Sequence, residues 1–109
     1  MLKKQYRLCL KKDFDNVFKS KKSLKSESLL LKYTNNDLTN PRIAFVVSNK
    51  VNKLATKRNY IKRILRNISR EHISLLPNID IVIVAFKEIN TKKYTEVKQE
   101  LDNLLNKIK

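Results

Sequence analysis

Nine cationic side chains lie between Leu38 and Arg70, a stretch that contains no aspartate or glutamate. They are Arg42, Lys50, Lys53, Lys57, Arg58, Lys62, Arg63, Arg66 and Arg70. Like charges four residues apart on a helix repel one another, so a solvated helix face usually mixes charges of both signs. An unrelieved basic stretch inside a foldable segment therefore favours a surface that binds a polyanion.

The spacing of these residues predicts a two-faced helix over residues 53–75. At about 100° per residue, the apolar positions share one arc of the helix; they are Leu54, Ile61, Ile64, Leu65, Ile68, His72 and Leu75. An adjoining arc carries Arg58, Lys62, Arg66 and Arg70 at steps of four, with Asn59 and Arg63 beside them. Guanidinium groups bind phosphate oxygens through paired hydrogen bonds. One arc would pack in the core, and the other would bind phosphates or remain an ordinary solvated face.

The remaining chemistry-bearing residues do not form a catalytic pattern. The acids of the C-terminal third, among them Glu71, Asp80, Glu88, Glu96 and Glu100, are spread out without a tight motif. His72 and Cys9 are each the single residue of their type, so metal-ligand spacing is lacking. Glycine is absent, which excludes a P-loop and a Gly-rich dinucleotide turn. We therefore predict no catalytic or metal-binding residues, a core or boundary position for His72, and a partly buried Cys9.

The composition fits one small RNA-binding domain over residues 1–109, with a mobile basic segment at residues 1–12. The net charge is +15 and the pI is about 10.1, while 41% of the residues are hydrophobic. The chain has no apolar run of about 18 residues, and no apolar signal region follows its first residues. A helix lying on a membrane surface is conceivable, but its apolar residues would be needed for the core. We expect a cytoplasmic protein with a nucleic-acid partner and no membrane partner.

The elements that would position the basic helix indicate an α+β sandwich. Asp13 is placed to cap a helix that ends near Ser20, and a brief strand is expected near Leu24. Residues 29–34 and 42–48 read as strands that would form an antiparallel hairpin. Residues 79–86 are apolar enough for a strand covered on both faces. Asn90-Thr91 would open a final amphipathic helix.

The basic helix resembles a motif of the protein subunit of bacterial ribonuclease P. It reads Arg58-Asn59-Tyr60-Ile61-Lys62-Arg63-Ile64-Leu65-Arg66, with Tyr60 where that family's second arginine usually lies. Ser48-Asn49-Lys50 is similar to the family's Ser-Lys-Lys turn, and a family glycine just beyond is replaced by Asn52 or Lys53. The segments 13–18 and 80–84 are similar to the family's first helix and last strand. The resemblance covers nearly the whole chain in the right order.

The resemblance implies the element order αβββαβα with a left-handed βαβ crossover, similar to the second domain of a small-subunit ribosomal protein. It also implies an enzyme whose chemistry belongs to its RNA: the protein would assist endonucleolytic removal of the 5′ leader from precursor tRNA. Its partners would be ribonuclease P RNA and precursor tRNA, with no small-molecule substrate. The protein itself would bind no cofactor, and Mg²⁺ would lie on the RNA subunit.

Two sets of site residues follow from the resemblance and the residue chemistry. Contacts with the catalytic RNA are expected from Lys50, Lys53, Lys57, Arg58, Asn59, Lys62, Arg63, Arg66 and Arg70. Contacts with the leader are expected from Phe14, Phe18, Tyr33, Ser48 and Lys50, because aromatic platforms beside positive charge bind single-stranded RNA. Ordinary core packing is the alternative for both phenylalanines. A structural RNA-binding protein of the ribosomal type, without a role in cleavage, is the alternative function; a helix-based DNA-binding protein is a weaker one.

Overall fold

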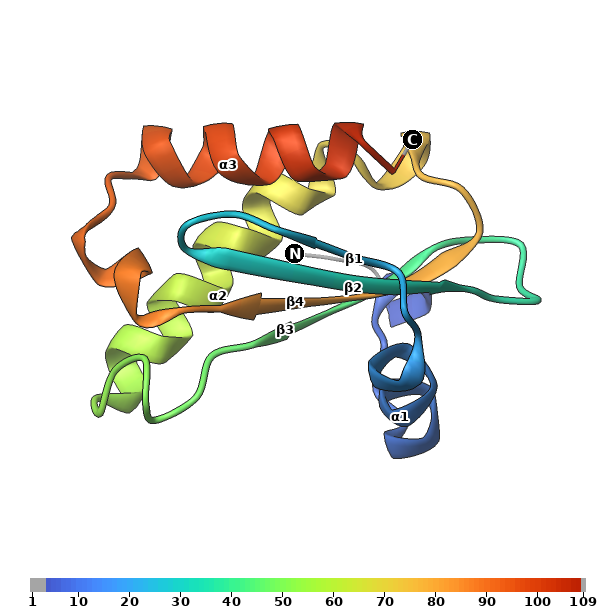
Figure 1. Ribbon diagram of the computed structural model, residues 1–109, viewed down its shortest axis with the longest axis horizontal. Coiled ribbons are helices and arrows are strands. Elements are labelled where there is room, and N and C mark those ends of the chain that lie inside the picture. The colour runs from blue at the N-terminus through green and yellow to red at the C-terminus, as the bar shows by residue number, and fades with distance from the viewer. Residues whose placement is uncertain (1–3, 109) are drawn as a thin grey trace.

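The computed structural model describes residues 4–108, which form three α-helices and one four-stranded sheet (Figure 1). The helices and strands are α1 (Lys11–Lys19), β1 (Ser23–Lys25), β2 (Leu29–Asn35), β3 (Arg42–Val46), α2 (Ala55–Arg70), β4 (Ile79–Ala85) and α3 (Tyr94–Asn106). Short 3-10 turns lie at η1 (Lys4–Tyr6), η2 (Ile73–Leu75) and η3 (Lys87–Thr91). The α+β class and the order αβββαβα are as predicted.

Strand β4 lies inside the sheet, whose strand order is β1-β2-β4-β3. It pairs antiparallel with β2, where Leu31 faces Ile83, and parallel with β3, where Phe45 faces the same Ile83. The predicted hairpin between residues 29–34 and 42–48 is therefore wrong, because β4 lies between the two strands. The continuous apolar sequence of β4 suits this position, since a central strand is covered on both faces. The parallel pair β3–β4 is joined through α2 in a βαβ crossover.

The two faces of the sheet are covered unequally (Figure 1). Helices α2 and α3 pack on one face, here called the closed face, over a continuous apolar core. Leu65 of α2, Leu101 of α3 and Ile81 of β4 are completely buried in it. Of the helices within residues 4–108, only α1 packs on the other face, here called the open face, together with the segment around Leu8. Its smaller core consists of Leu8, Val17, Ala44 and Val82, with Phe14, Val46 and Val84 partly buried against it.

The helix boundaries differ from the predicted ones. Helix α1 begins at Lys11 after Leu10, and Asp13 does not cap it but forms a partly buried ion pair with Arg42. Helix α2 is shorter than residues 53–75, so Leu54 and Leu75 lie beyond its ends and are 58% and 65% exposed. Residues Asn90-Thr91 belong to η3, and α3 begins only at Tyr94.

The N-terminal segment is packed where the sequence predicts mobility. Residues 1–3 of that segment lie outside the described residues. Leu8 is buried under the open face, and its amide donates a hydrogen bond to the Ile43 carbonyl. Arg7 also forms a bridge with Ile43 along the edge of β3. Apolar burial of Leu8 therefore holds the segment against the sheet, whereas the neighbouring Cys9, predicted to be partly buried, is exposed.

Candidate nucleic-acid interface

One side of α2 forms a cationic face, defined here as Arg58, Asn59, Lys62, Arg63, Arg66 and Arg70. The opposite side of the helix supplies Ile61, Leu65 and Ile68 to the closed-face core, as the helical spacing predicts. Arg58, Lys62 and Arg66 are half-buried at the border of that core, while Asn59, Arg63 and Arg70 are exposed. Among residues 4–108, no acidic side chain forms an ion pair with the cationic face. Its positive charge is therefore uncompensated.

Arg58 also fixes the loop that leads into α2. Its Nη1 donates hydrogen bonds to the carbonyl oxygens of Asn52, at 3.0 Å, and Lys53, at 2.9 Å. The predicted contacts Lys50, Lys53 and Lys57 are exposed in this loop and in the first turn of α2. Ser48 is exposed just after β3, and its carbonyl accepts the amide of Val51. The loop thus carries cations on a backbone that Arg58 holds in place.

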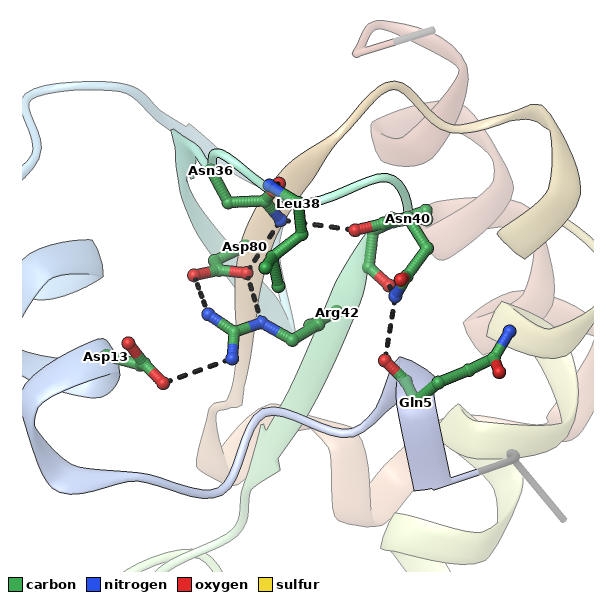
Figure 2. Close-up of polar contacts among 8 residues, drawn as sticks. Gln5, Asp13, Asn36, Leu38, Asn40, Arg42 and Asp80 are labelled. Atoms are coloured by element: carbon green, nitrogen blue, oxygen red, sulfur yellow. Dashed lines mark hydrogen bonds and ion pairs between the residues drawn. The ribbon is translucent and has the colours of Figure 1, made fainter.

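Arg42 belongs to the acid-free stretch but not to the cationic face. Its Nε and Nη2 donate to the two carboxylate oxygens of Asp80 at 2.8 and 2.7 Å, and Nη1 donates to Asp13 at 3.1 Å (Figure 2). Asn36 donates to the same Asp80 carboxylate at 2.9 Å. The hydrogen bonds to Asp80 outweigh burial and raise the pKa of Arg42. Arg42 therefore ties α1 to β3 and β4 instead of facing a polyanion.

A cleft of about 280 Å³ runs along the outer edge of β3, where Arg7 forms its bridge with Ile43, and is named here the β3-edge cleft. It is lined by Arg7, Leu8, Cys9, Phe14, Ile43, Ala44, Phe45, Lys62 and Arg66. Strand β3 is an outer strand of the sheet, so side chains from both faces reach this edge. The cleft therefore connects Phe14 on the open face with Lys62 and Arg66 on the cationic face.

The predicted aromatic contacts do not share one face. Phe14 lines the β3-edge cleft, and Phe18 is 43% exposed near the end of α1. Tyr33 instead lies on the same face of β2 as Leu29 and Leu31 and packs against the closed-face core. The structure therefore does not bring Tyr33 together with the two phenylalanines.

The residue before Tyr33 takes the place that was expected for the tyrosine. Lys32 lies next to α1, and its Nζ donates to the Phe18 carbonyl at 3.3 Å. A shift of one residue along a strand moves each side chain to the other face of the sheet. The strand predicted at residues 29–34 did not specify which of its residues face α1. The alternating burial of Leu29 and Leu31 is the signal that would have assigned it. Ser48 and Lys50 follow the C-terminal end of β3, whereas Arg42, at its start, is the residue that contacts α1; the end of β3 lies away from α1 (Figure 1).

His72 has the structural role that its position in the apolar arc predicts. It is 8% exposed, and its Nε2 lies 2.6 Å from Oδ1 of Asp102 on α3. Burial would raise the pKa of Asp102, but hydrogen bonds with His72 and Lys98 outweigh burial and lower it. This pair joins the end of α2 to α3. Within residues 4–108, no three acidic, histidine or cysteine side chains gather into a metal-binding group.

The fold and its surface define a small, strongly basic α+β protein with a cationic helix on the closed face of its sheet and a sparsely covered open face opposite. No helix within residues 4–108 has the length and apolarity needed to cross a membrane. The family model for ribonuclease P matches residues 2–109. The chain belongs to the ribonuclease P protein family, whose members are protein components of the enzyme of tRNA 5′ processing.

Individual relatives agree in sequence and in structure. The ribonuclease P protein component of Pseudoalteromonas atlantica is 37% identical over 105 residues, which cover 96% of this chain and 88% of that protein. That of Thermotoga maritima is 36% identical and covers 94% and 91%. The solved structure of the Thermotoga maritima protein in complex with 1-(4-fluorophenyl)-2-thiourea has a TM-score of 0.85 at 34% identity, covering 94% of this chain and all of that one. A Staphylococcus aureus RNase P protein mutant, with defective mRNA degradation activity, has a TM-score of 0.88 at 26% identity, covering 94% and 87%.

Proposed function

We propose that this chain binds the catalytic RNA of ribonuclease P through its cationic face and the 5′ leader of precursor tRNA on its open face. The observation that carries the proposal is the cationic face itself, which lacks acidic partners among the described residues and adjoins the β3-edge cleft. Family membership makes a large RNA the expected polyanion. The protein would then assist an endonucleolytic reaction whose chemistry the RNA performs.

The cationic face suits the backbone of a folded RNA. Arg63 and Arg70 are exposed on it, and Lys62 and Arg66 border the β3-edge cleft. Arginine can bind two oxygens of one phosphate, while Asn59 can donate to phosphate or accept from a ribose hydroxyl. Each phosphate contact would release counterions, so binding should weaken steeply as salt rises.

The open face suits a single strand. Phe14 and Phe18 offer aromatic surface on α1, and Lys32 adds a cation between α1 and β2. Bases stack on such aromatic side chains while lysines hold the backbone. Ser48 and Lys50 lie beyond the other end of β3, so a single-stranded RNA that reached them would run along the sheet from α1. This extended path fits a leader better than a compact duplex.

The chain's own acids do not suit a protein-borne hydrolysis. Asp13 and Asp80 are engaged by Arg42, and Asp102 is engaged by His72 and Lys98. Metal-assisted phosphodiester cleavage needs carboxylates that converge on the cations. We therefore assign the reaction, and the Mg²⁺ that it uses, to the RNA subunit.

Reconstitution tests the proposal directly. The purified chain is added to a bacterial ribonuclease P RNA at low magnesium, and 5′ cleavage of precursor tRNA is followed on gels. We expect specific cleavage to be restored. A correctly folded chain that binds RNA but gives no stimulation would overturn the proposal in favour of a structural RNA-binding protein.

The cationic face can be tested without disturbing the fold. Lys62→Ala combined with Arg63→Ala should weaken binding of the catalytic RNA and reduce the slope of log K against log salt by about one unit per lost phosphate contact. Arg58 is a poorer choice for this test, because its hydrogen bonds to the Asn52 and Lys53 carbonyls also hold the loop. Lys107→Ala, on an exposed cation after α3, is the matched control and should leave the slope unchanged.

A further inference from the structure

A second cavity lies on the other side of α2, between that helix and the start of α3. Its volume is about 150 Å³, and it is lined by Lys57, Tyr60, Ile61, Ile64, Ile89, Asn90, Lys92, Tyr94 and Val97. The isoleucines and Val97 form an apolar floor that is continuous with the closed-face core. Sites for drug-sized ligands measure about 300–1,000 Å³, so this cavity suits a smaller group such as one planar ring.

Two tyrosines from different helices line this cavity. Tyr60 is 57% exposed and Tyr94 is 45% exposed, although both adjoin buried apolar residues. A single exposed aromatic residue is ordinary on a protein surface. Two exposed phenol rings on one cavity are instead a surface on which another flat ring can stack.

Tyr60 borders the cationic face. Along α2 it lies about 60° beyond Arg63 and about 40° before Ile64, at the boundary between the cationic and apolar arcs. A nucleotide whose base entered the cavity would therefore have its phosphate next to Arg63. Lys57 lines the same cavity and has no acidic partner among residues 4–108, whereas Lys92 is paired with Glu27 at 3.0 Å.

The cavity wall is fixed before any ligand arrives. The Asn90 amide donates to the carbonyls of Val51 and Lys87, and its oxygen accepts from Asn52 at 3.0 Å. These bonds tie η3 to the loop that Arg58 also holds. Such a preformed site avoids the cost of ordering on binding.

We infer that Tyr60 and Tyr94 form a site for one unpaired base of the bound RNA, with Lys57 and Arg63 at its phosphate. The inference rests on the proposed function, since the RNA must first bind to the cationic face. The role of Tyr60 would then differ from that of the arginine that the family usually has at this position: the tyrosine would stack on a base, whereas an arginine would bind a phosphate.

The test uses the full chain and ribonuclease P RNA. Tyr60→Leu and Tyr94→Leu keep apolar bulk but remove the stacking ring, so each should weaken binding by about 5- to 20-fold. The double variant should lose little more than either single variant, because both remove one shared contact. Tyr60→Phe keeps the ring and should retain the native affinity. The salt slope should stay unchanged in the leucine variants, whereas Lys57→Ala should lower it by about one unit.

A direct signal is available because the chain contains no tryptophan. Tyr60→Trp introduces a single tryptophan, which can be excited apart from the tyrosines and whose emission should be quenched on addition of the RNA if a base stacks on it. Native affinity in both leucine variants would overturn the inference and leave the cavity to another occupant, such as a protein. Weaker binding with a lowered salt slope would also overturn it, because it would indicate a phosphate contact. If the native chain fails to bind the RNA, the proposed function itself fails.

Discussion

The two faces of the sheet differ in what covers them and in what they can do. The closed face lies under α2 and α3, and its core includes completely buried residues from three strands and two helices. The open face has only α1 and the Leu8 segment, which leave Leu30, Val46 and Val84 partly buried. The stabilising free energy increases with the apolar area that is buried, so the closed face must contribute most of the hydrophobic stabilisation of the fold. The open face is thereby left available for ligands.

The two faces also differ in how their helices are attached. Helix α1 is held to the sheet by a small core and by the Arg42 ion pairs with Asp13 and Asp80. Helix α2 is held by the apolar side chains of Ile61, Leu65 and Ile68, and within residues 4–108 Arg58 is the one member of its cationic face with a side-chain hydrogen bond to the rest of the fold. The cationic face of α2, which is proposed to bind RNA, can therefore be altered with little effect on stability, whereas the attachment of α1 depends on charge as well as packing.

The largest expected effect is on the closed face. Leu65→Ala removes a completely buried side chain at the centre of α2 and should lower the free energy of unfolding by about 2–5 kcal/mol. Urea denaturation measures it. Leu54→Ala, 58% exposed just before α2, should change stability by no more than about 0.5 kcal/mol. Equal losses in both variants would contradict the division into packed and solvated positions.

The next largest effect concerns the attachment of α1. Arg42→Ala leaves two largely buried carboxylates unpaired and should lower the free energy of unfolding by about 2–4 kcal/mol. Arg63→Ala removes an exposed arginine from the cationic face and should change it by no more than about 0.5 kcal/mol. Denaturation of both variants, followed by RNA binding, separates the roles: Arg63→Ala should weaken RNA binding, and Arg42→Ala should mainly weaken the fold. The reverse result would place Arg42 in the RNA-binding surface.

The fold was largely readable from the sequence because its signals are local. The 3.6-residue spacing of Ile61, Leu65 and Ile68 predicts the buried side of α2, and the apolar run Ile79–Ala85 predicts a strand covered on both faces. Strand pairing is not local. Nothing within residues 29–48 indicates that β4, more than 30 residues later, separates β2 from β3. The hairpin was the simpler connection, and the structure does not use it.

The candidate site could be predicted where the basic residues follow the helical period. It could not be predicted where a shift of one residue along a strand changes the face of the sheet on which a side chain lies. The cations of α2 lie together on one side of the helix, as predicted. Arg42 instead forms ion pairs with Asp13 and Asp80, which are distant from it in sequence. Tyr33 was assigned by residue type, while the register of β2 turns it to the closed face and turns Lys32 to α1. The contact residues of the RNA on both surfaces stay predictions.

A smaller effect can separate the two faces at the leader. Phe18→Ala should reduce the difference in binding free energy between precursor and mature tRNA by about 1–2 kcal/mol if a base stacks on Phe18. Tyr33→Leu should leave this difference unchanged, because Tyr33 packs on the closed face. Binding of both tRNAs to the reconstituted holoenzyme measures the difference. A loss confined to Tyr33→Leu would show that the leader does not use the open face.

The smallest expected effect is a pH dependence on the closed face. Glu100 of α3 accepts hydrogen bonds from the Ser28 hydroxyl at 2.6 Å and the Ser28 amide at 3.1 Å, which join α3 to the start of β2. Burial would raise the pKa of Glu100, but the hydrogen bonds outweigh burial and lower it. A lowered pKa means that the folded state binds the proton less readily than the unfolded state. Glu100 therefore stabilises the fold above its unfolded pKa of about 4.3, and this stabilisation is lost as the pH falls through the lower folded value.

Substitution isolates this contribution from the other carboxylates. Glu100→Gln should cost about 1 kcal/mol at pH 7, where the native carboxylate makes charge-assisted hydrogen bonds, and less at an acid pH below the lowered folded pKa, where the native side chain is itself protonated. Urea denaturation at the two pH values gives the difference. Glu88→Gln, an exposed change in η3, should cost little at either pH. If the cost of Glu100→Gln were the same at both pH values, neutral packing of the Glu100 side chain, and not its charge, would be what joins α3 to β2.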